Sequence, residues 1–465
     1  MELPKDFIER TKILLGTDEY LQFEASLSAD APISIRMNRD KSDFSPNTAT
    51  VQWCEEGYYL PERIPFTFDP LFHAGTYYVQ EASSMFLGHV VRHFVQEPSV
   101  ILDLCAAPGG KSTHLLSAMP KGSLLVSNEV IRSRCNILAE NIAKWGNPNH
   151  IVTNNDPKEI GKLTHFFDVI VADVPCSGEG MFRKDNESIN EWTTENVMLC
   201  AARCRRILND IWNALKPGGV FILSTCTFNT EENEENVKYA IEELGASPIE
   251  IPVNQEWKII PALKYNYPAY HFFPHKTKGE GFFLAAFRKA DSENQTFHLK
   301  NNKKNRQKER AQTPASNDWQ RYLSDADSYI AEWDNFCLRA IPATFREKYQ
   351  LLKSQLTVVD AGIYVGEQKG KDFIPSEELA LSTALNRTAF QETKLSYADA
   401  IRYLKKETFP LPGNTEKGYI LVTYENIPLG FMKNIGNRAN NLYPQEWRIR
   451  SSFCPEQTKT LSNFR

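Results

Sequence analysis

The sequence predicts an α/β fold built on a mainly parallel sheet, and three observations support this. Strand-like apolar runs alternate with helical patterns from about residue 98, which is the rhythm of βαβ units with parallel strands. A small-residue turn with two adjacent glycines follows the first run, and polar residues end the later runs. Open parallel sheets bind ligands at the carboxyl ends of their strands, so we expect the functional site at that edge.

Five apolar runs define the strands of the expected sheet. They are residues 100–106, 123–129, 150–156, 167–176 and 219–227. The clearest helix comes before the last run, where apolar residues recur at spacings of three and four from Val197 to Leu215. The stretch Lys216-Pro217-Gly218-Gly219 then ends the helical pattern.

Composition and charge are typical of a globular protein. The 465 residues suggest about three domains, and 42% hydrophobic with 24% charged residues is ordinary for a folded chain. The formal net charge is -5, from 53 basic and 58 acidic residues. Any contact with nucleic acid must therefore rely on local basic patches.

The chain shows no signal for secretion or membrane insertion. Acidic residues occur from the start of MELPKDFIERTKILLG, which lacks the apolar core and cleavage site of a signal peptide. No apolar run reaches the roughly 18 residues of a membrane span. Nine cysteines without a CxxC pair are typical of reduced thiols rather than of a zinc site. We expect a soluble cytoplasmic protein with no bound metal and no membrane partner.

A polar segment at residues 291–317 interrupts the α/β rhythm. It contains a cluster of basic residues, which are Lys303, Lys304, Arg306, Lys308 and Arg310. We interpret the segment as a linker, with a basic strip on RNA as the alternative. Helical patterns and short strand-like runs after it indicate a smaller α+β region up to the C-terminus.

The glycine turn lies in DLCAAPGGKSTHLL, residues 103–116. A nucleoside-triphosphate loop requires glycine where this chain has Cys105, and a GxGxxG dinucleotide turn fails because only Gly109 and Gly110 are present. A tight turn that brings backbone close to a ligand remains. Glu129 follows about 20 residues later, where a carboxylate accepts hydrogen bonds from ribose hydroxyls. We expect a nucleoside ligand without essential phosphates.

Four more polar residues fall at the same expected edge. Asp156 either reaches an adenine amino group or caps the next helix ahead of a proline, and both readings stay open. Asp173 and Cys176 end one strand, and Cys226 ends another. Cysteine is often a small core residue, so the spacing of the two thiols does not by itself establish chemistry.

Three segments resemble the signature motifs of the Sun family of RNA (cytosine-5)-methyltransferases: DLCAAPGGKSTHL, ADVPCSGEGMFRKD and LSTCTFNTEENEENV. Further matches are SIRMNRDK (34–41), YYVQEASSM (77–85) and GEGFFLAAFRK (279–289). The segment GFMKNIGNRANNLYPQEWRIR (430–450) resembles the C-terminal PUA-like region of the RsmF-type bacterial branch. The resemblance covers residues 30–290 well and residues 318–390 less sharply.

The resemblance implies a fold, a set of domains and an activity. It implies a Rossmann-like class I methyltransferase domain over 76–290, an N-terminal α+β RNA-binding extension over 1–75 and a PUA-like RNA-binding domain over 391–465. The linker at 291–317 and an intermediate α+β domain at 318–390 lie between them. The implied cofactor is S-adenosylmethionine. The implied substrate is carbon 5 of a cytosine in RNA, with 16S ribosomal RNA first and transfer RNA second.

The resemblance also assigns roles to residues by motif position. Cys226 becomes the nucleophile, and Cys176 helps to release the product. The implied contacts of the methyl donor are Cys105, Ala106, Ala107, Pro108, Gly109, Gly110, Lys111, Glu129, Asp156 and Asp173.

The chemistry explains why two thiols are useful. Carbon 5 of cytosine attacks a methyl group only after a thiolate has added to carbon 6, and cysteine is the most nucleophilic side chain available. We expect the site to lower the pKa of Cys226. Asp173 could share a proton with ring nitrogen 3 if burial raises its pKa. Cys176 is then placed for the later loss of the carbon 5 proton.

A base inside an RNA helix must be unpaired or flipped out to reach such a site. Arg36, Lys41, Arg183 and Lys184 are candidates for holding the RNA backbone, although lone basic residues are often merely solvated. Two other functions stay open. One is a non-catalytic RNA-binding or ribosome assembly factor. The other is a DNA cytosine methyltransferase, in which the Pro-Cys thiol would itself be the nucleophile.

Overall fold

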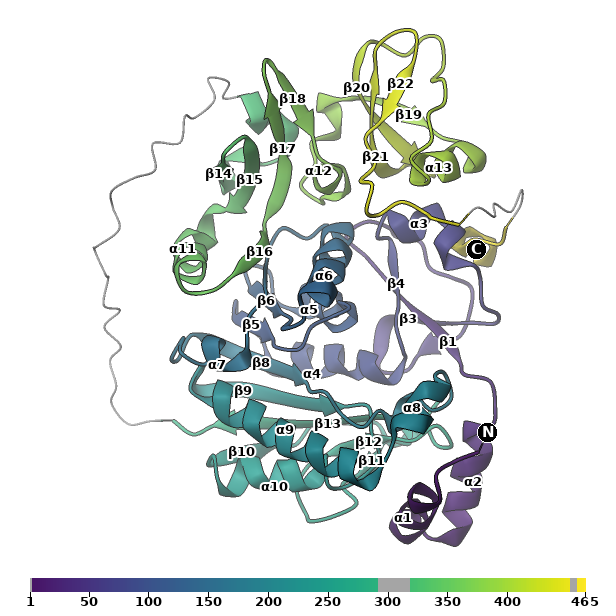
Figure 1. Cartoon of the computed structure of the whole chain (residues 1–465), viewed down its shortest axis with the longest axis vertical. Helices are drawn as coiled ribbons and strands as arrows, with labels where there is room; N and C mark the ends of the chain where they lie inside the picture. The colour runs from purple at the N-terminus through teal and green to yellow at the C-terminus, as the bar shows by residue number, and fades with distance from the viewer. Residues whose placement is uncertain (1, 292–317, 452–457) are drawn as a thin grey trace.

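The computed structural model describes residues 2–291, 318–451 and 458–465. A large sheet and its helices occupy the middle of the molecule, with smaller units at the N-terminal and C-terminal ends of the chain (Figure 1). The predicted linker, with its basic cluster, lies almost entirely outside the described residues. None of the described helices is long and apolar enough to cross a membrane.

The central sheet contains all five predicted strands. Its members, taken across the sheet, are β11 (Ile260–Pro261), β12 (Tyr270–Phe272), β13 (Phe282–Lys289), β9 (Leu215–Thr225), β8 (Phe167–Asp173), β5 (Val100–Asp103), β6 (Leu124–Asn128), β7 (His150–Thr153) and β16 (Val358–Ala361), with β10 (Ala246–Ile249) beside β13. The strands β7, β6, β5, β8 and β9 run parallel. Antiparallel strands flank this parallel core, with β13 beside β9 and β16 beside β7. The predicted α/β fold with a mainly parallel core is confirmed.

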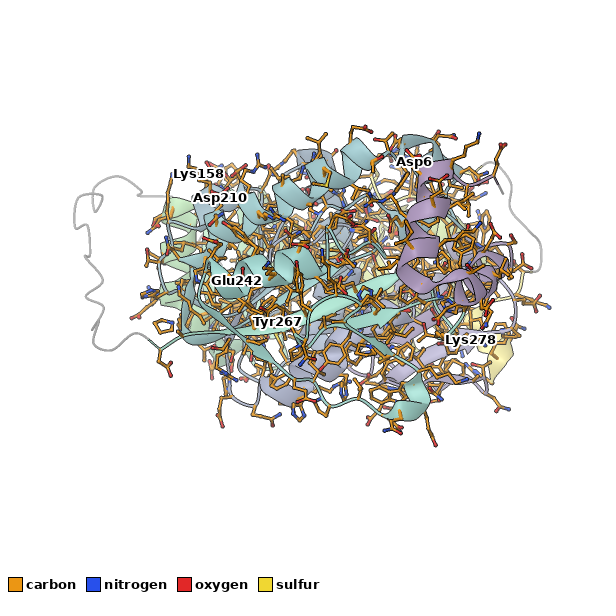
Figure 2. All side chains as sticks on the ribbon, turned by 90° about the horizontal axis from the view of Figure 1, so that it is seen from below. Asp6, Lys158, Asp210, Glu242, Tyr267 and Lys278 are labelled. Atoms are coloured by element: carbon orange, nitrogen blue, oxygen red, sulfur yellow. The ribbon has the colours of Figure 1, made fainter. Side chains whose placement is uncertain are left out.

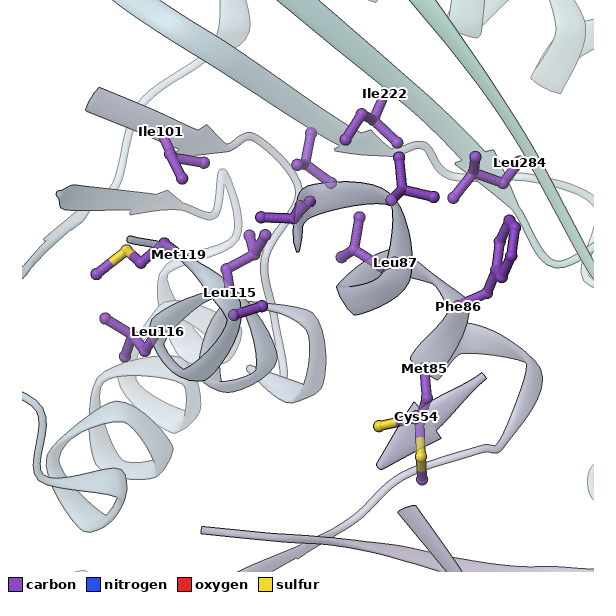
Figure 3. Close-up of a cluster of buried hydrophobic side chains, with 14 of the residues drawn as sticks. Cys54, Met85, Phe86, Leu87, Ile101, Leu115, Leu116, Met119, Ile222 and Leu284 are labelled. Atoms are coloured by element: carbon purple, nitrogen blue, oxygen red, sulfur yellow. The ribbon is translucent and has the colours of Figure 1, made fainter. Parts of the chain in front are cut away.

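Helices cover both faces of this sheet (Figure 1). One face packs on α4 (Phe86–Phe94), α5 (Gly110–Ala118) and α6 (Arg132–Trp145), and the other on α7 (Pro157–Ile160), α9 (Thr194–Trp212) and α10 (Glu234–Glu242). The side chains of β5 alternate between the two layers, as strand geometry requires. Ile101 joins the first core, and Val100 and Leu102 join the second. Figure 3 shows part of the first core, in which Leu87 faces the sheet residues Ile222 and Leu284 and Leu115 lies beside Met119.

Helix α9 is shorter at its end than predicted. Thr193 caps its start by accepting a hydrogen bond from the Asn196 backbone N–H, and the helix ends at Trp212. Leu215 already pairs with Phe167, so the Pro-Gly-Gly stretch that was expected to end the helix lies within β9. The register shift between Phe167 and Val169 accommodates these extra residues. Charged side chains such as Lys158, Asp210 and Glu242 cover the outside of this helical layer (Figure 2).

The N-terminal region forms two leading helices, a small antiparallel sheet and a short third α-helix. Its elements are α1 (Lys5–Leu15), α2 (Thr17–Leu27), β1 (Ile33–Met37), β2 (Thr50–Val51), β3 (Cys54–Leu60), α3 (Pro70–His73) and β4 (Tyr77–Val79). The sheet order is β2-β3-β1-β4. Phe7, Tyr20 and Phe23 of the two helices pack with Phe182 and Phe228, which lie in the loops after β8 and β9. The N-terminal helices therefore support the loops that follow the predicted site residues.

The C-terminal region contains two further four-stranded sheets. Its main elements are β14 (Tyr329–Asp334), β15 (Cys337–Pro342), α11 (Arg346–Gln355), β17 (Ile363–Lys369), β18 (Asp372–Pro375), α12 (Glu377–Leu381), β19 (Gln391–Lys394), α13 (Tyr397–Leu404), β20 (Gly418–Tyr424), β21 (Ile427–Asn434) and β22 (Ala439–Asn441). The sheet orders are β14-β15-β17-β18 and β19-β20-β21-β22. The predicted domain boundaries stay predictions. Strand β16 lies within the predicted intermediate domain but pairs with β7 of the central sheet.

Candidate active site

The two thiols meet at the carboxyl edge of the central sheet. Cys176 follows β8 and Cys226 follows β9, and these two strands are parallel neighbours. The Sγ atoms lie 3.1 Å apart, and the Cys226 backbone N–H donates to the Cys176 Sγ at 3.4 Å. Fifty residues of sequence separate the two cysteines, so the sheet topology alone brings them together.

The contact makes the two thiols chemically different. The hydrogen bond to Cys226 and burial raise the pKa of Cys176 well above the ordinary value for a thiol. The Cys176 thiol therefore stays protonated at neutral pH. The contact allows the Cys176 S–H to donate a hydrogen bond to the Cys226 sulfur.

Asp173 and Lys111 form an ion pair beside the thiols. The Lys111 Nζ lies 2.8 Å from one carboxylate oxygen of Asp173, and the Ser224 hydroxyl donates to the other at 2.8 Å. Burial alone would lower the pKa of Lys111. The neighbouring Asp173 carboxylate, with a smaller contribution from Cys226, has the opposite effect, and the pKa of Lys111 is raised. Lys111 is thus a cation close enough to interact with the Cys226 sulfur.

The glycine turn connects β5 to α5. Gly109 precedes the helix with a φ of +116°, a conformation that side chains rarely adopt. A side chain at Gly110 would come within 3.2 Å of the Tyr78 ring. Arg134 and Asn141 of α6 donate to the backbone oxygens of Ala107 and Pro108 at 2.9 and 2.8 Å. The turn is therefore tight, and hydrogen bonds from α6 hold its backbone in place.

Cys105 and Asp103 lie at the start of this turn. Burial raises the pKa of the Cys105 thiol, so it stays protonated. Asp103 is fully buried and accepts a hydrogen bond of 2.7 Å from the Ser112 hydroxyl, and burial raises its pKa to about 7. Its second oxygen has no hydrogen-bond partner in the described part of the chain. Sequence reasoning did not single out Asp103, although it stands at the end of β5, where the site was expected.

Glu129 and Asp156 both lie at strand ends of the same edge. Glu129 is 3% exposed and accepts from the Ile131 backbone N–H at 2.9 Å, with Arg134 at 3.3 Å. Asp156 accepts from the Lys158 backbone N–H at 2.9 Å and forms a capping box at the start of α7. The helix-cap reading of Asp156 is confirmed, and the adenine contact stays a prediction.

The predicted RNA contacts of Arg36 and Lys41 need correction, because both side chains point inward. Arg36 is fully buried and donates to Gln80, Thr113 and the Gly110 carbonyl. The Lys41 ammonium donates to two backbone carbonyls, and burial lowers its pKa to about 7. These residues connect the N-terminal region to helices α5 and α6 of the central layer.

Arg183 and Lys184 differ in exposure. The Arg183 side chain is 7% exposed and binds Glu280 at 2.9 Å, together with the backbone carbonyls of Ser26 and Gly279. Lys184 lies 3.5 Å from Glu280 and its side chain is 36% exposed. Of the four predicted residues, Lys184 has the side chain that is substantially exposed to solvent. Arg183 is bound by partners within the protein, so its predicted RNA contact needs correction as well.

Sequence models of three related regions match most of the chain. The model described as 16S rRNA methyltransferase RsmB/F matches residues 94–288, that of the RsmF N-terminal domain matches residues 3–82, and that of the methyltransferase RsmF PUA domain matches residues 390–449. The ribosomal RNA small subunit methyltransferase F of Aliivibrio fischeri is 29% identical, over 93% of this chain and 94% of its own length. The Escherichia coli protein of that name is 28% identical over 89% of both chains.

Solved structures agree in fold. A methyltransferase homologue from Pyrococcus horikoshii covers 62% of this chain and 95% of its own, with 26% identity and a TM-score of 0.52. NSun6 from Pyrococcus horikoshii covers 62% of this chain and 99% of its own, with 21% identity and a TM-score of 0.53. The expected methyltransferase fold is thus confirmed. The chain belongs to the RsmB/F family of methyltransferases, in its RsmF-type branch.

Proposed function

We propose that this enzyme methylates carbon 5 of a cytosine in the RNA of the small ribosomal subunit, through a covalent bond between Cys226 and the base. The observation that carries this proposal is the contact of 3.1 Å between the Cys176 and Cys226 sulfurs at the ligand-binding edge of the sheet. A core-filling role would not need both thiols at the open ends of neighbouring strands.

The residues at this edge suit S-adenosylmethionine. The left-handed Gly109 allows close backbone approach, the buried Asp103 has an oxygen without a hydrogen-bond partner among the described residues, and Glu129 ends β6 as an acceptor for ribose hydroxyls. The cofactor, when bound, supplies a sulfonium methyl group. We assign its binding to the turn from Cys105 to Lys111 and to Glu129, with Asp156 near the adenine.

Cys226 acts first in the proposed reaction. Its thiolate adds to carbon 6 of the cytosine, and the electron density moves to carbon 5, which becomes the nucleophile for the methyl group. Lys111 stabilises the thiolate electrostatically, and Asp173 stabilises a proton at ring nitrogen 3. The raised pKa of Cys176 keeps it from competing for carbon 6.

Cys176 acts last. After methylation, carbon 5 carries both a methyl group and a proton, and the Cys226 bond breaks only when that proton leaves. Once Cys226 is bonded to carbon 6, its charge and hydrogen bond no longer raise the pKa of Cys176, so the Cys176 thiol can release its proton to water. The resulting thiolate lies beside the adduct, because the two sulfurs touch, and it accepts the carbon 5 proton. Elimination of the Cys226 thiolate then restores the aromatic ring and frees the product.

The C-terminal region supplies cations for holding RNA. Arg438 and Arg448 are exposed within the segment that matches the PUA domain, and the Lys184 side chain is 36% exposed. Contacts of this kind neutralise phosphates and make RNA affinity fall with salt. We expect the enzyme to act in the cytoplasm on ribosomal RNA.

Bisulfite sequencing of RNA from cells that lack this gene tests the proposal. One cytosine or more in 16S ribosomal RNA should lose protection, and wild-type protein but not Cys226→Ala should restore it. Loss of protection only in transfer RNA would assign the enzyme to that substrate instead. Unchanged protection in both RNA classes would contradict the proposed function.

A further inference from the structure

Two buried glutamates link the loops that carry the thiols. Glu179 follows Cys176 by three residues, and Glu232 follows Cys226 by six. Both are 2% exposed, and each binds groups on the loop that carries the other. Buried carboxylates are costly unless they are hydrogen-bonded, so their bonding pattern indicates what they hold.

Glu232 reaches from the Cys226 loop to the Cys176 loop. It accepts from the Ser177 backbone N–H at 2.9 Å with one oxygen, and from the Ser177 hydroxyl and the Asn229 amide with the other. Ser177 is the residue directly after Cys176. Glu232 therefore fixes the backbone immediately next to the Cys176 thiol.

Glu179 makes the reciprocal connection. One of its oxygens accepts from the backbone N–H groups of Phe228 and Asn229, at 2.7 and 3.1 Å. The other accepts from the Trp192 indole at 3.0 Å and from the Asn229 amide at 2.9 Å. Phe228 and Asn229 follow Cys226 by two and three residues, so Glu179 fixes the backbone of the Cys226 loop.

Asn229 lies at the centre of this network and connects the two glutamates through its side chain. The Asn229 amide donates to both glutamates. The backbone N–H of Gly180 also donates to the Cys226 carbonyl at 2.8 Å. Neither loop can shift without breaking hydrogen bonds on both sides.

We propose that Glu179 and Glu232 are positioning residues that hold the Cys176 and Cys226 thiols in contact by binding each other's loop. The need for that contact rests on the proposed methyl transfer, because proton removal must occur beside the Cys226 adduct. The contact itself does not depend on the reaction and can be measured without RNA.

Replacing either glutamate by glutamine should disturb its hydrogen bonds, and the disturbance should be larger at Glu179 than at Glu232. All four groups that meet Glu179 are N–H donors, so the NH₂ of a glutamine would face a donor in either orientation. Glu232 meets one hydroxyl, which can turn to accept. Glu179→Gln should therefore disturb the thiol contact more than Glu232→Gln.

Cross-linking with diamide measures the contact. Diamide oxidises two thiols to a disulfide and is itself reduced to the hydrazine, and peptide mass spectrometry identifies the Cys176–Cys226 product. We expect slower cross-linking by about tenfold or more for Glu179→Gln, which corresponds to about 1.4 kcal/mol, and a smaller decrease for Glu232→Gln. Glu231→Gln is the matched control, because Glu231 is the neighbouring residue but binds Arg10 in α1 at 2.5 Å.

A second measurement separates positioning from loss of fold. Binding of S-adenosylmethionine by calorimetry should be unchanged in both variants, because the glycine turn and Glu129 lie on other strands. If Glu179→Gln does not bind cofactor, Glu232→Gln provides the test. Cross-linking of Glu232→Gln at the wild-type rate, with cofactor binding intact, overturns the positioning role.

Incubation with RNA and cofactor adds a functional readout. Glu232→Gln should retain more covalent protein–RNA adduct on a denaturing gel than wild type or Glu231→Gln, because proton removal is slowed. Failure of wild type to methylate RNA would contradict the proposed function and leave the cross-linking result standing. If the thiols of a variant cross-link slowly but the variant releases product normally, the thiol contact is not needed for product release. That result would overturn the claim that the contact supports the reaction.

Discussion

Arg36 should matter for the stability of the enzyme and not for RNA contact, and Arg36→Met tests this. Its guanidinium donates to Gln80 at 2.8 Å, to Thr113 at 2.7 Å and to the Gly110 carbonyl at 3.3 Å. It also lies 4.4 Å from the centre of the Trp145 ring. These partners belong to the N-terminal region, to α5 and to α6, so one side chain joins three parts of the molecule.

The magnitude follows from these contacts. Three hydrogen bonds from a charged donor contribute about 4.5 kcal/mol at the low end of their range, and a desolvated cation–π contact contributes about 2 kcal/mol. Burial of the charge opposes this by several kcal/mol, and it lowers the pKa of Arg36 to about 10. We expect a net loss of about 3 kcal/mol in the free energy of unfolding for Arg36→Met.

Urea unfolding, followed by fluorescence, measures the loss. The matched control is Arg39→Met, since Arg39 is exposed at the end of the same strand and should cost under about 1 kcal/mol. RNA binding should keep its salt dependence in Arg36→Met. The reasoning is refuted if stability changes by less than about 1 kcal/mol while the salt slope falls by about one, the change expected for a lost phosphate contact.

Two further predictions concern the cofactor and the C-terminal region. Glu129→Gln should weaken S-adenosylmethionine binding by about tenfold in calorimetry, because a charged acceptor is lost; an unchanged Kd would contradict the ribose assignment. Burial opposes the charge of Asp360, but Arg339 and His150 lower its pKa well below the usual value. A lowered pKa stabilises the fold above the unfolded pKa of about 3.9, and this stability is lost as the pH falls through the folded pKa. Asp360→Asn should therefore lower stability at pH 7 by about 3 kcal/mol and flatten its decrease below about pH 4; acid unfolding identical to wild type would contradict this.

Much of the central fold could be predicted because its signals are local. Each buried strand is a short apolar run that ends at a polar residue, and the glycine turn follows the first strand directly. The parallel order then places Cys176 and Cys226 on one edge without knowledge of any distant contact. The sheet topology confirms that placement.

Features that depend on distant contacts could not be predicted. The pairing of β16 with β7 joins residues about 200 positions apart, and its short run carries no mark of its partner. Arg36 is an arginine in a polar motif, and only the fold shows that Trp145 and Thr113 surround it. Glu232 lies among several acids in TEENEEN, and nothing local distinguishes the buried Glu232 and Glu234 from Glu231, which faces Arg10.

The most direct test of the central claim compares Cys226→Ala and Cys176→Ala on one denaturing gel, after incubation with the natural RNA and S-adenosylmethionine. Cys226 adds to carbon 6 before any methyl transfer, so Cys226→Ala should give neither methylation nor a covalent protein–RNA adduct. Cys176 acts at release, so Cys176→Ala should accumulate an adduct that survives denaturation. Adduct formation by Cys226→Ala and none by Cys176→Ala would reverse the two roles and contradict the mechanism.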